Sequence, residues 1–150
     1  MKKIIVAAVL MASVFAVKAN DVTWSWWCDN KHAKTDLSFG IGAQCLAVDT
    51  LEISAIYGAS PSVGAFQWSV FGINNSKMDG CLQLAPWANI GGKPCVQLSF
   101  VNMADQTVFT MGFLNFAKTS SKVQLGFLNF NKNGFLPVFP FINLDKSLFE

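Results

Sequence analysis

The sequence reads Val123-Gln-Leu-Gly-Phe-Leu-Asn129 and, one repeat earlier, Phe109-Thr-Met-Gly-Phe-Leu-Asn115. Two further copies precede them, Cys95-Val-Gln-Leu-Ser-Phe-Val-Asn102 and the shorter Cys81-Leu-Gln-Leu84. The Gln or Thr position recurs after 14, 13 and 14 residues, and Asn follows it five residues later in the last three copies. Self-similarity at a fixed period is the signature of stacked structural units. The residues that define this repeat are Gln83, Gln97, Gln124, Asn102, Asn115 and Asn129.

The period predicts an all-β fold built from short stacked strands of about 14 residues per repeat. In a parallel β-solenoid, each repeat lies over its neighbour and like residues stack. We expect the apolar row to form the core and the Asn side chains to form a ladder at a corner. The expected core row comprises Val96, Leu98, Phe100, Phe109, Met111, Phe113, Val123, Leu125 and Phe127.

A small eight-stranded antiparallel outer-membrane β-barrel is the alternative fold, because the strands carry no charge on either face. The apolar row is short for the ~25 Å apolar band of such a barrel. Asn would also share that row, where lipid disfavours it. Antiparallel strands would further give no reason for every copy to read alike from the same end.

The first 19 residues have the pattern of a secretory signal peptide. Lys2 and Lys3 precede an apolar run from Ile4 to Val17, which is too short to span a bilayer as a helix. We therefore expect residues 1–19 to be a signal peptide, 20–36 a Trp-rich N-terminal cap, 37–133 the β repeats, and 134–150 a Pro-containing C-terminal cap and tail. The cap assignment for 134–150 depends on Pro137 and Pro140, which remove ladder donors.

Composition argues against nucleic-acid binding. The signal peptide takes three of the eleven basic residues, so eight lysines face nine acids in the mature chain, a net charge of about −1. The chain has no arginine, and nothing in it forms the basic footprint that nucleic acid requires.

All four cysteines follow the signal peptide, and an even count in an exported chain favours disulfides. Cys81 and Cys95 hold the same place in consecutive copies, so parallel stacking would set them about 4.8 Å apart. We predict a Cys81–Cys95 bridge, with Cys28–Cys45 as a weaker second.

Three tryptophans, Trp24, Trp26 and Trp27, crowd the start of the mature chain. We expect them to pack over the open end of the β core, because no polar partner set accompanies them. A ligand platform for glycan is the alternative.

The sequence offers no catalytic, cofactor-binding or metal-binding set. His32 is the only histidine and has Lys31, Ala33 and Lys34 as neighbours, and the cysteines form no Cys-x-x-Cys pair. Six of the nine acidic residues are scattered singly and are expected at turns: Asp29, Asp36, Asp49, Glu52, Asp79 and Asp105. We therefore expect no enzymatic activity and no cofactor.

The repeats, followed by Gly134-Phe-Leu-Pro-Val-Phe-Pro-Phe-Ile-Asn143, resemble a family of exported bacterial surface-repeat proteins. Members carry a signal peptide, several Gly-Leu-Gln-Ile-Gly-Leu-x-Asn copies and a closing Leu-Pro-x-x-Pro-x-x-Asn. The similarity covers 37–143. The chain departs from the pattern at Ser99, at Thr110 and at Pro86-Trp87.

Repetition, export and the lack of catalytic groups together predict a non-enzymatic cell-envelope repeat protein that presents a rigid β surface for an interaction or structural role. The expected location is the periplasm, outer membrane or cell surface. The expected partner is an unidentified protein or envelope component, the outer membrane included, and no nucleic acid. The alternatives are an integral outer-membrane β-barrel and a glycan-binding module that uses the Trp cluster.

Overall fold

A computed structural model describes residues 21–77 and 82–149. The predicted signal peptide and Cys81 therefore lie outside the described residues. The described strands are β1 (Val22–Trp27), β2 (Asn30–Ala43), β3 (Cys45–Gly58), β4 (Phe66–Ser69), β5 (Ile73–Ser76), β6 (Leu82–Leu84), β7 (Ala88–Gly91), β8 (Val96–Leu98), β9 (Val101–Met111), β10 (Leu114–Asn131) and β11 (Val138–Leu144), and a 3₁₀ segment, η1 (Lys146–Leu148), follows.

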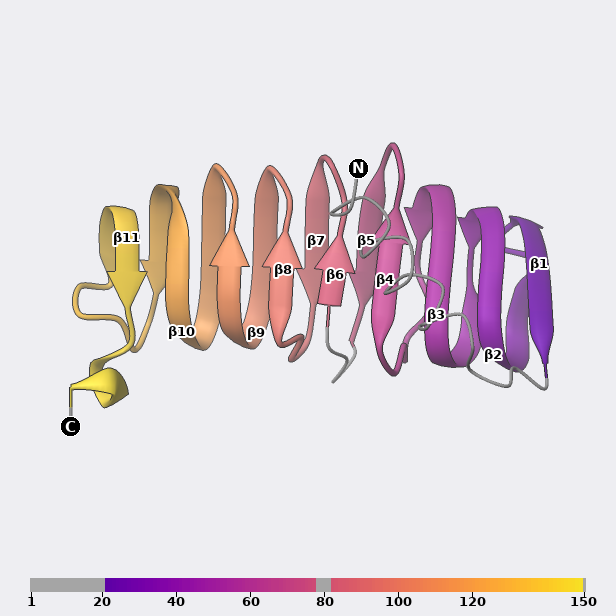
Figure 1. The fold of residues 1–150 in the computed structure, drawn as a ribbon, viewed down its shortest axis with the longest axis horizontal. Coiled ribbons are helices and arrows are strands. Elements are labelled where there is room, and N and C mark those ends of the chain that lie inside the picture. The colour runs from indigo at the N-terminus through magenta and orange to yellow at the C-terminus, as the bar shows by residue number, and fades with distance from the viewer. Residues whose placement is uncertain (1–20, 78–81, 150) are drawn as a thin grey trace, which may run out of the picture.

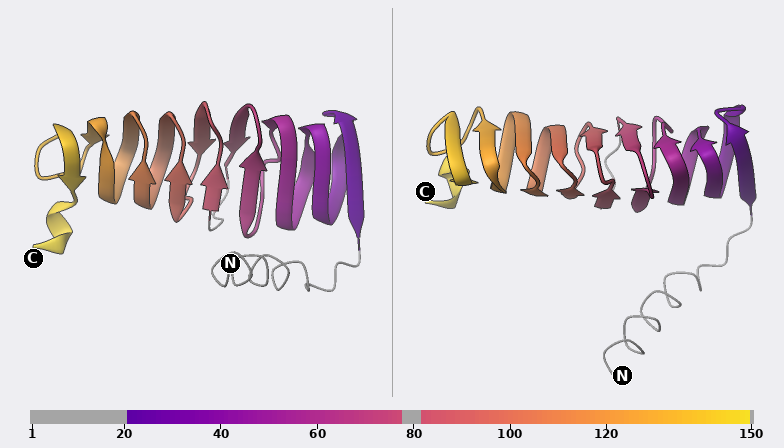
Figure 2. Two further views of the ribbon diagram at one scale, coloured as in Figure 1. Left: turned by 45° about the horizontal axis from the view of Figure 1, so that its top comes forward. Right: turned by 90° about the horizontal axis from the view of Figure 1, so that it is seen from above.

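The strands wind into a parallel β-solenoid of about seven turns with a 14-residue period. Consecutive coils lie side by side along one axis, with β1 at one end and β11 at the other (Figure 1). The same column of coils is seen from two further directions (Figure 2). This confirms the predicted solenoid. The antiparallel alternative is wrong, because every ladder from β1 to β10 is parallel.

Each coil has two strand segments joined by a tight corner. One segment carries the Gln position of the repeat and the other carries its Asn position, as β8 and the first part of β9 do with Gln97 and Asn102. In-register pairing then places Gln over Gln and Asn over Asn in successive coils. Like side chains therefore stack, as the period predicts.

The interior of the solenoid is polar, so the expected apolar core is wrong. Gln97 and Asn102 are fully buried, whereas none of the nine residues of the expected core row is buried. The only described cluster of buried hydrophobic residues is small and joins Cys45, Val48 and Val63. The protein buries amides and leaves most of its large apolar side chains partly or fully exposed.

The two ends of the solenoid are finished differently. β11 pairs with β10 in the antiparallel direction, so it cannot continue the parallel stack. At the other end β1 has a ladder partner on one side only among the described residues. Side chains cap part of its free edge: Asn30 donates to the Trp24 carbonyl at 2.8 Å, and the Trp26 N–H donates to Asp29 at 3.4 Å. Such capping occupies backbone groups of an edge strand that could otherwise pair with a strand of another chain.

Within the described ranges, the structure contains no helix with the length and apolar character needed to cross a bilayer.

Candidate functional site

The first buried row runs through the Gln position of each coil, and we name it the glutamine row. Its members are Ser38, Glu52, Gln67, Gln83, Gln97, Thr110 and Gln124, paired in register from coil to coil. Gln83 donates its amide to Gln67 at 2.8 Å, and Gln97 donates to Gln83 at 2.7 Å. From Gln97 to Gln67, each amide therefore donates toward the N-terminal end of the solenoid.

The second buried row, the asparagine row, runs the opposite way. It comprises Asn74, Asn89, Asn102, Asn115 and Asn129. Asn102 donates to Asn115 at 2.9 Å, and Asn115 donates to Asn129 at 2.7 Å. The same Asn102 amide also donates to the Met111 carbonyl at 2.9 Å, on the Gln-bearing segment of the next coil. The row therefore fastens each corner as well as joining successive coils.

The chain of amide hydrogen bonds in the glutamine row ends on the carboxyl group of Glu52. Gln67 donates to Glu52 Oε1 at 2.6 Å, and the Ser60 hydroxyl donates to Glu52 Oε2. Burial raises the pKa of Glu52, and the hydrogen bonds from Ser60 and Gln67 oppose that rise only in part. Glu52 lies within β3 and is fully buried, so its expected place at a turn is wrong. No described lysine forms an ion pair with it; the salt bridge found among the described residues joins Lys118 and Asp105.

Two glycines make room for the buried amides. A Cβ at Gly58 would lie 2.8 Å from Glu52 Oε1 and 3.1 Å from Asn74 Oδ1. A Cβ at Gly91 would lie 2.8 Å from Gln83 Oε1. The two 2.8 Å approaches are closer than real Cβ contacts, so the buried Glu52 and Gln83 side chains favour Gly at these two positions.

On the outside, each corner between the Gln-bearing and the Asn-bearing segment presents one exposed apolar side chain. We name this line the aromatic ridge; its members are Ile56, Phe71, Trp87, Phe100, Phe113 and Phe127, which are 44–72% exposed. Backbone bonds hold successive corners together, as from Phe100 N to the Pro86 carbonyl and from Phe113 N to the Phe100 carbonyl. The ridge is thus a continuous feature of the solenoid and not a scatter of exposed side chains.

The opposite edge of the solenoid collects the charges. From β5 onward, the described charged residues before the C-terminal segment lie where an Asn-bearing segment turns toward the next Gln-bearing segment. They are Lys77, Lys93, Asp105, Lys118, Lys122 and Lys132, which we name the charged edge. One salt bridge joins neighbouring coils there, between Lys118 and Asp105 at 3.1 Å. Charge and exposed aromatic surface are therefore segregated to opposite sides of each coil.

The tryptophans of β1 do not pack over the end of the core. Trp24, Trp26 and Trp27 are 65%, 68% and 56% exposed, so the packing interpretation is wrong. Trp24 and Trp26 alternate with the buried Ser25 and therefore share the outer face of β1. This exposed pair keeps the platform interpretation open.

Cys28 and Cys45 are both free thiols, so the predicted Cys28–Cys45 bridge is wrong. Cys45 is fully buried beside the Ser38 hydroxyl, with the two side-chain atoms 3.5 Å apart. Burial raises the pKa of both thiols, which favours their protonated form. The Cys81–Cys95 bridge stays a prediction because Cys81 lies outside the described residues.

The described residues include no group of three or more His, Cys, Asp or Glu side chains that could hold a metal ion. His32 lies exposed in β2, near the N-terminal end of the solenoid. The described buried polar groups are amides, hydroxyls and the carboxyls of Glu52 and Asp145, and they bond to one another and to backbone groups. Such an arrangement offers structural hydrogen bonding and no acid–base pair aimed at an accessible cleft.

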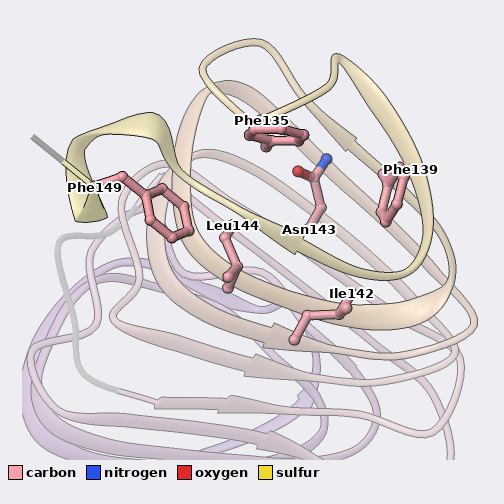
Figure 3. Close-up of a pocket in the computed structure, with 6 residues that line it drawn as sticks. All are labelled: Phe135, Phe139, Ile142, Asn143, Leu144 and Phe149. Atoms are coloured by element: carbon pink, nitrogen blue, oxygen red, sulfur yellow. The ribbon is translucent and has the colours of Figure 1, made fainter.

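A cavity of about 250 Å³ lies at the C-terminal end of the solenoid (Figure 3). Phe135 and Phe139 flank Asn143 there, and Phe149 lies next to Leu144. The Asn143 amide donates to the Leu136 carbonyl at 3.0 Å, and protein atoms cover its Oδ1. An occupant of this cavity would therefore meet apolar surface and no reachable hydrogen-bonding side chain.

Comparison of the chain with protein-family models, with curated proteins and with solved structures found no match.

The sequence identified the repeat-defining Gln and Asn residues, and the structure brings them together as two buried rows. It missed the aromatic ridge, although a signal was present. Phe100, Phe113 and Phe127 each stand three residues after the Gln or Thr position. A bulky apolar residue at a fixed place beside a small one, Ser99, Gly112 or Gly126, is the pattern of a tight outward corner.

Proposed function

We propose that this chain is a non-enzymatic, exported protein of the cell envelope whose rigid β-solenoid presents an apolar outer surface to another envelope component. The observation that supports it most is the inverted distribution of side chains. Amides fill the interior, while aromatic and aliphatic side chains stay exposed along the corners and outer strand faces. A soluble monomer rarely leaves more than a few hundred Å² of contiguous apolar surface uncovered.

The rigidity of that surface follows from the buried rows. Every coil is tied to its neighbours by backbone ladders and by side-chain bonds such as Asn102 to Asn115. Repeats that bond to their neighbours in this way form an extended surface of fixed spacing. A fixed surface favours a structural or docking role over a role that requires domain motion.

The export part of the proposal rests on Lys2, Lys3 and the apolar run that follows. Expression of the whole chain with its own leader in a Gram-negative host tests it by cell fractionation and by sequencing of the mature N-terminus. The expected product starts near Asn20 and is found in the envelope fractions. A product that keeps Met1 and stays in the cytosol would refute the proposal.

A glycan-binding role is the second candidate, and the exposed Trp24 and Trp26 favour it because they share one face of β1. Flat aromatic rings on one face suit the apolar faces of sugar rings. Retention of the mature chain on immobilised envelope glycans, with and without the double change Trp24→Ala and Trp26→Ala, tests this role. Equal retention of both proteins would remove it.

A further inference from the structure

The aromatic ridge has the properties of a preorganised insertion edge. The rings of Phe100 and Phe113 stack with centroids 4.9 Å apart at an interplanar angle of 3°. Those of Phe113 and Phe127 stack at 4.9 Å and 2°. Phe141 then closes the line edge-on against Phe127 at 6.4 Å. Stacked rings on a hydrogen-bonded corner have little conformational freedom left to lose on binding.

The charge distribution separates this ridge from water-facing surface. All members of the charged edge lie on the other side of their coils, and the ridge itself contains no charged residue. The strand faces that flank the ridge between β6 and the end of β10 are also free of charged side chains, apart from the turn segments of the charged edge. An uncharged edge matches the acyl region of a bilayer in polarity, while the charged edge on the far side stays hydrated.

The size and shape of the ridge decide between a protein partner and a lipid partner. Six side chains at these exposures present on the order of 600–700 Å² of apolar surface, given ~150–250 Å² for each aromatic side chain. A stable protein interface needs about 800 Å² from each partner. Two copies meeting ridge to ridge would touch along a line one residue wide, whereas a bilayer surrounds a convex ridge on both sides.

Much of the corner backbone that would enter lipid is already hydrogen-bonded. At the ridge, corner N–H groups donate to the carbonyls of the preceding coil, as Trp87 N does to the Gly72 carbonyl and Leu128 N to the Phe113 carbonyl. Backbone groups satisfied in this way can enter an apolar medium at little cost. The open strand edges lie at the two ends of the solenoid, away from the middle of the ridge.

We propose that the aromatic ridge inserts into the interfacial region of a lipid bilayer, with the solenoid axis parallel to the membrane and the charged edge facing water. This inference rests on the proposed envelope function and names its partner as the lipid itself. Trp and Phe are typical of the apolar face of elements that lie in the plane of a membrane interface. Attachment depends on apolar burial, so anionic lipid and low salt are not required.

Flotation of the mature chain with vesicles of pure phosphatidylcholine tests the proposal, at 0.1 M and at 1 M NaCl. The wild-type chain is expected to float equally at both salt concentrations. The triple change Phe100→Ser, Phe113→Ser and Phe127→Ser is expected to lower the partition coefficient by roughly 100-fold or more, because it removes about half of the ridge. The triple change to Leu at the same positions is expected to retain binding.

A matched control carries Val108→Ser, Leu148→Ser and Phe149→Ser, three exposed apolar positions away from the ridge. It should float like the wild type, and far-ultraviolet circular dichroism of each variant checks that the β fold is kept. Wild-type protein that fails to float, a folded ridge variant that floats undiminished, or binding that needs anionic lipid and is lost in 1 M NaCl would each overturn the proposal. If the chain is exported but does not bind vesicles, the proposed insertion into lipid is wrong, whereas the proposed envelope function is not contradicted.

Discussion

Glu52 places a carboxyl group in the polar interior of the solenoid. Its carboxyl group is buried with only Ser60 and Gln67 as hydrogen-bond donors. A buried carboxylate without a cationic partner favours its neutral form, which is why burial raises the pKa of Glu52 above the ordinary 4.5. Glu52, in the glutamine row, therefore takes up a proton more readily in the folded protein than in the unfolded chain.

Glu52→Gln should stabilise the protein at neutral pH by on the order of 1–3 kcal/mol, because the amide keeps the bond from Gln67 without a buried charge. The pH dependence follows from the raised pKa. The folded state holds the Glu52 proton more tightly, so the contribution of Glu52 to stability is fully present below pH 4.5 and is lost as pH rises through the folded pKa. Urea unfolding of both proteins should show a gap that is small in acid and widens toward neutral pH. A constant gap would contradict the assignment.

At the scale of the element, the corner explains why the sequence predicted the repeat but placed its faces wrongly. Strict alternation puts Val96, Leu98 and Phe100 on one face, with Asn102 on the same row. In the structure the corner at 99–100 interrupts the alternation, so Gln97 and Asn102 both point inward although they are five residues apart. A corner leaves the repeat period unchanged, but it changes which residues point inward. The alternation of a strand predicts side-chain direction only as far as the strand continues without a corner.

The glutamine row is interrupted at Thr110. Thr110 is in register with Gln97 on one side and Gln124 on the other, but its side chain is too short to span the row. Gln97 Oε1, Thr110 Oγ1 and Gln124 Oε1 are all buried without a hydrogen-bond partner. Unsatisfied groups of this kind lower stability, so this coil is the weak point of the row.

Thr110→Gln should raise the free energy of unfolding by about 0.5–1.5 kcal/mol, because the new amide can donate to Gln97 and accept from Gln124. Thr110→Leu is the control, since it adds similar volume without an amide and should destabilise the protein. Denaturant melts of the two variants beside the wild type measure both changes. Equal effects of Gln and Leu would show that volume, not hydrogen bonding, governs this position.

The Cys81–Cys95 bridge can be tested at the same scale. Leu82 and Val96, which directly follow the two cysteines, are in register between β6 and β8. A bridge closing so short a loop contributes about 3 kcal/mol. Peptide mapping without reductant should recover the two cysteines in one linked fragment, and reduction should lower stability by a similar amount. Recovery of Cys81 as a free thiol would exclude the bridge.

For the whole molecule, the sequence was sufficient to predict the stacked parallel coils, because only parallel stacking brings like residues together at a fixed period. It was not sufficient to assign inside and outside. Hydrophobic burial normally decides that question, since apolar surface is expelled from water. Here the Gln and Asn side chains form hydrogen bonds with one another when they stack within the coils. The aromatic rings stack on the surface instead.

The central claim, an amide interior under an apolar exterior, is tested most directly by comparing the unfolding free energies of two single variants. Gln97→Leu removes a buried amide that bonds to Gln83, and it leaves that partner's carbonyl unpaired, so a loss of about 2–3 kcal/mol is expected. Met111→Gln changes an exposed apolar residue to a polar one and should cost less than about 0.5 kcal/mol. A nearly neutral Gln97→Leu beside a strongly destabilising Met111→Gln would contradict the claim.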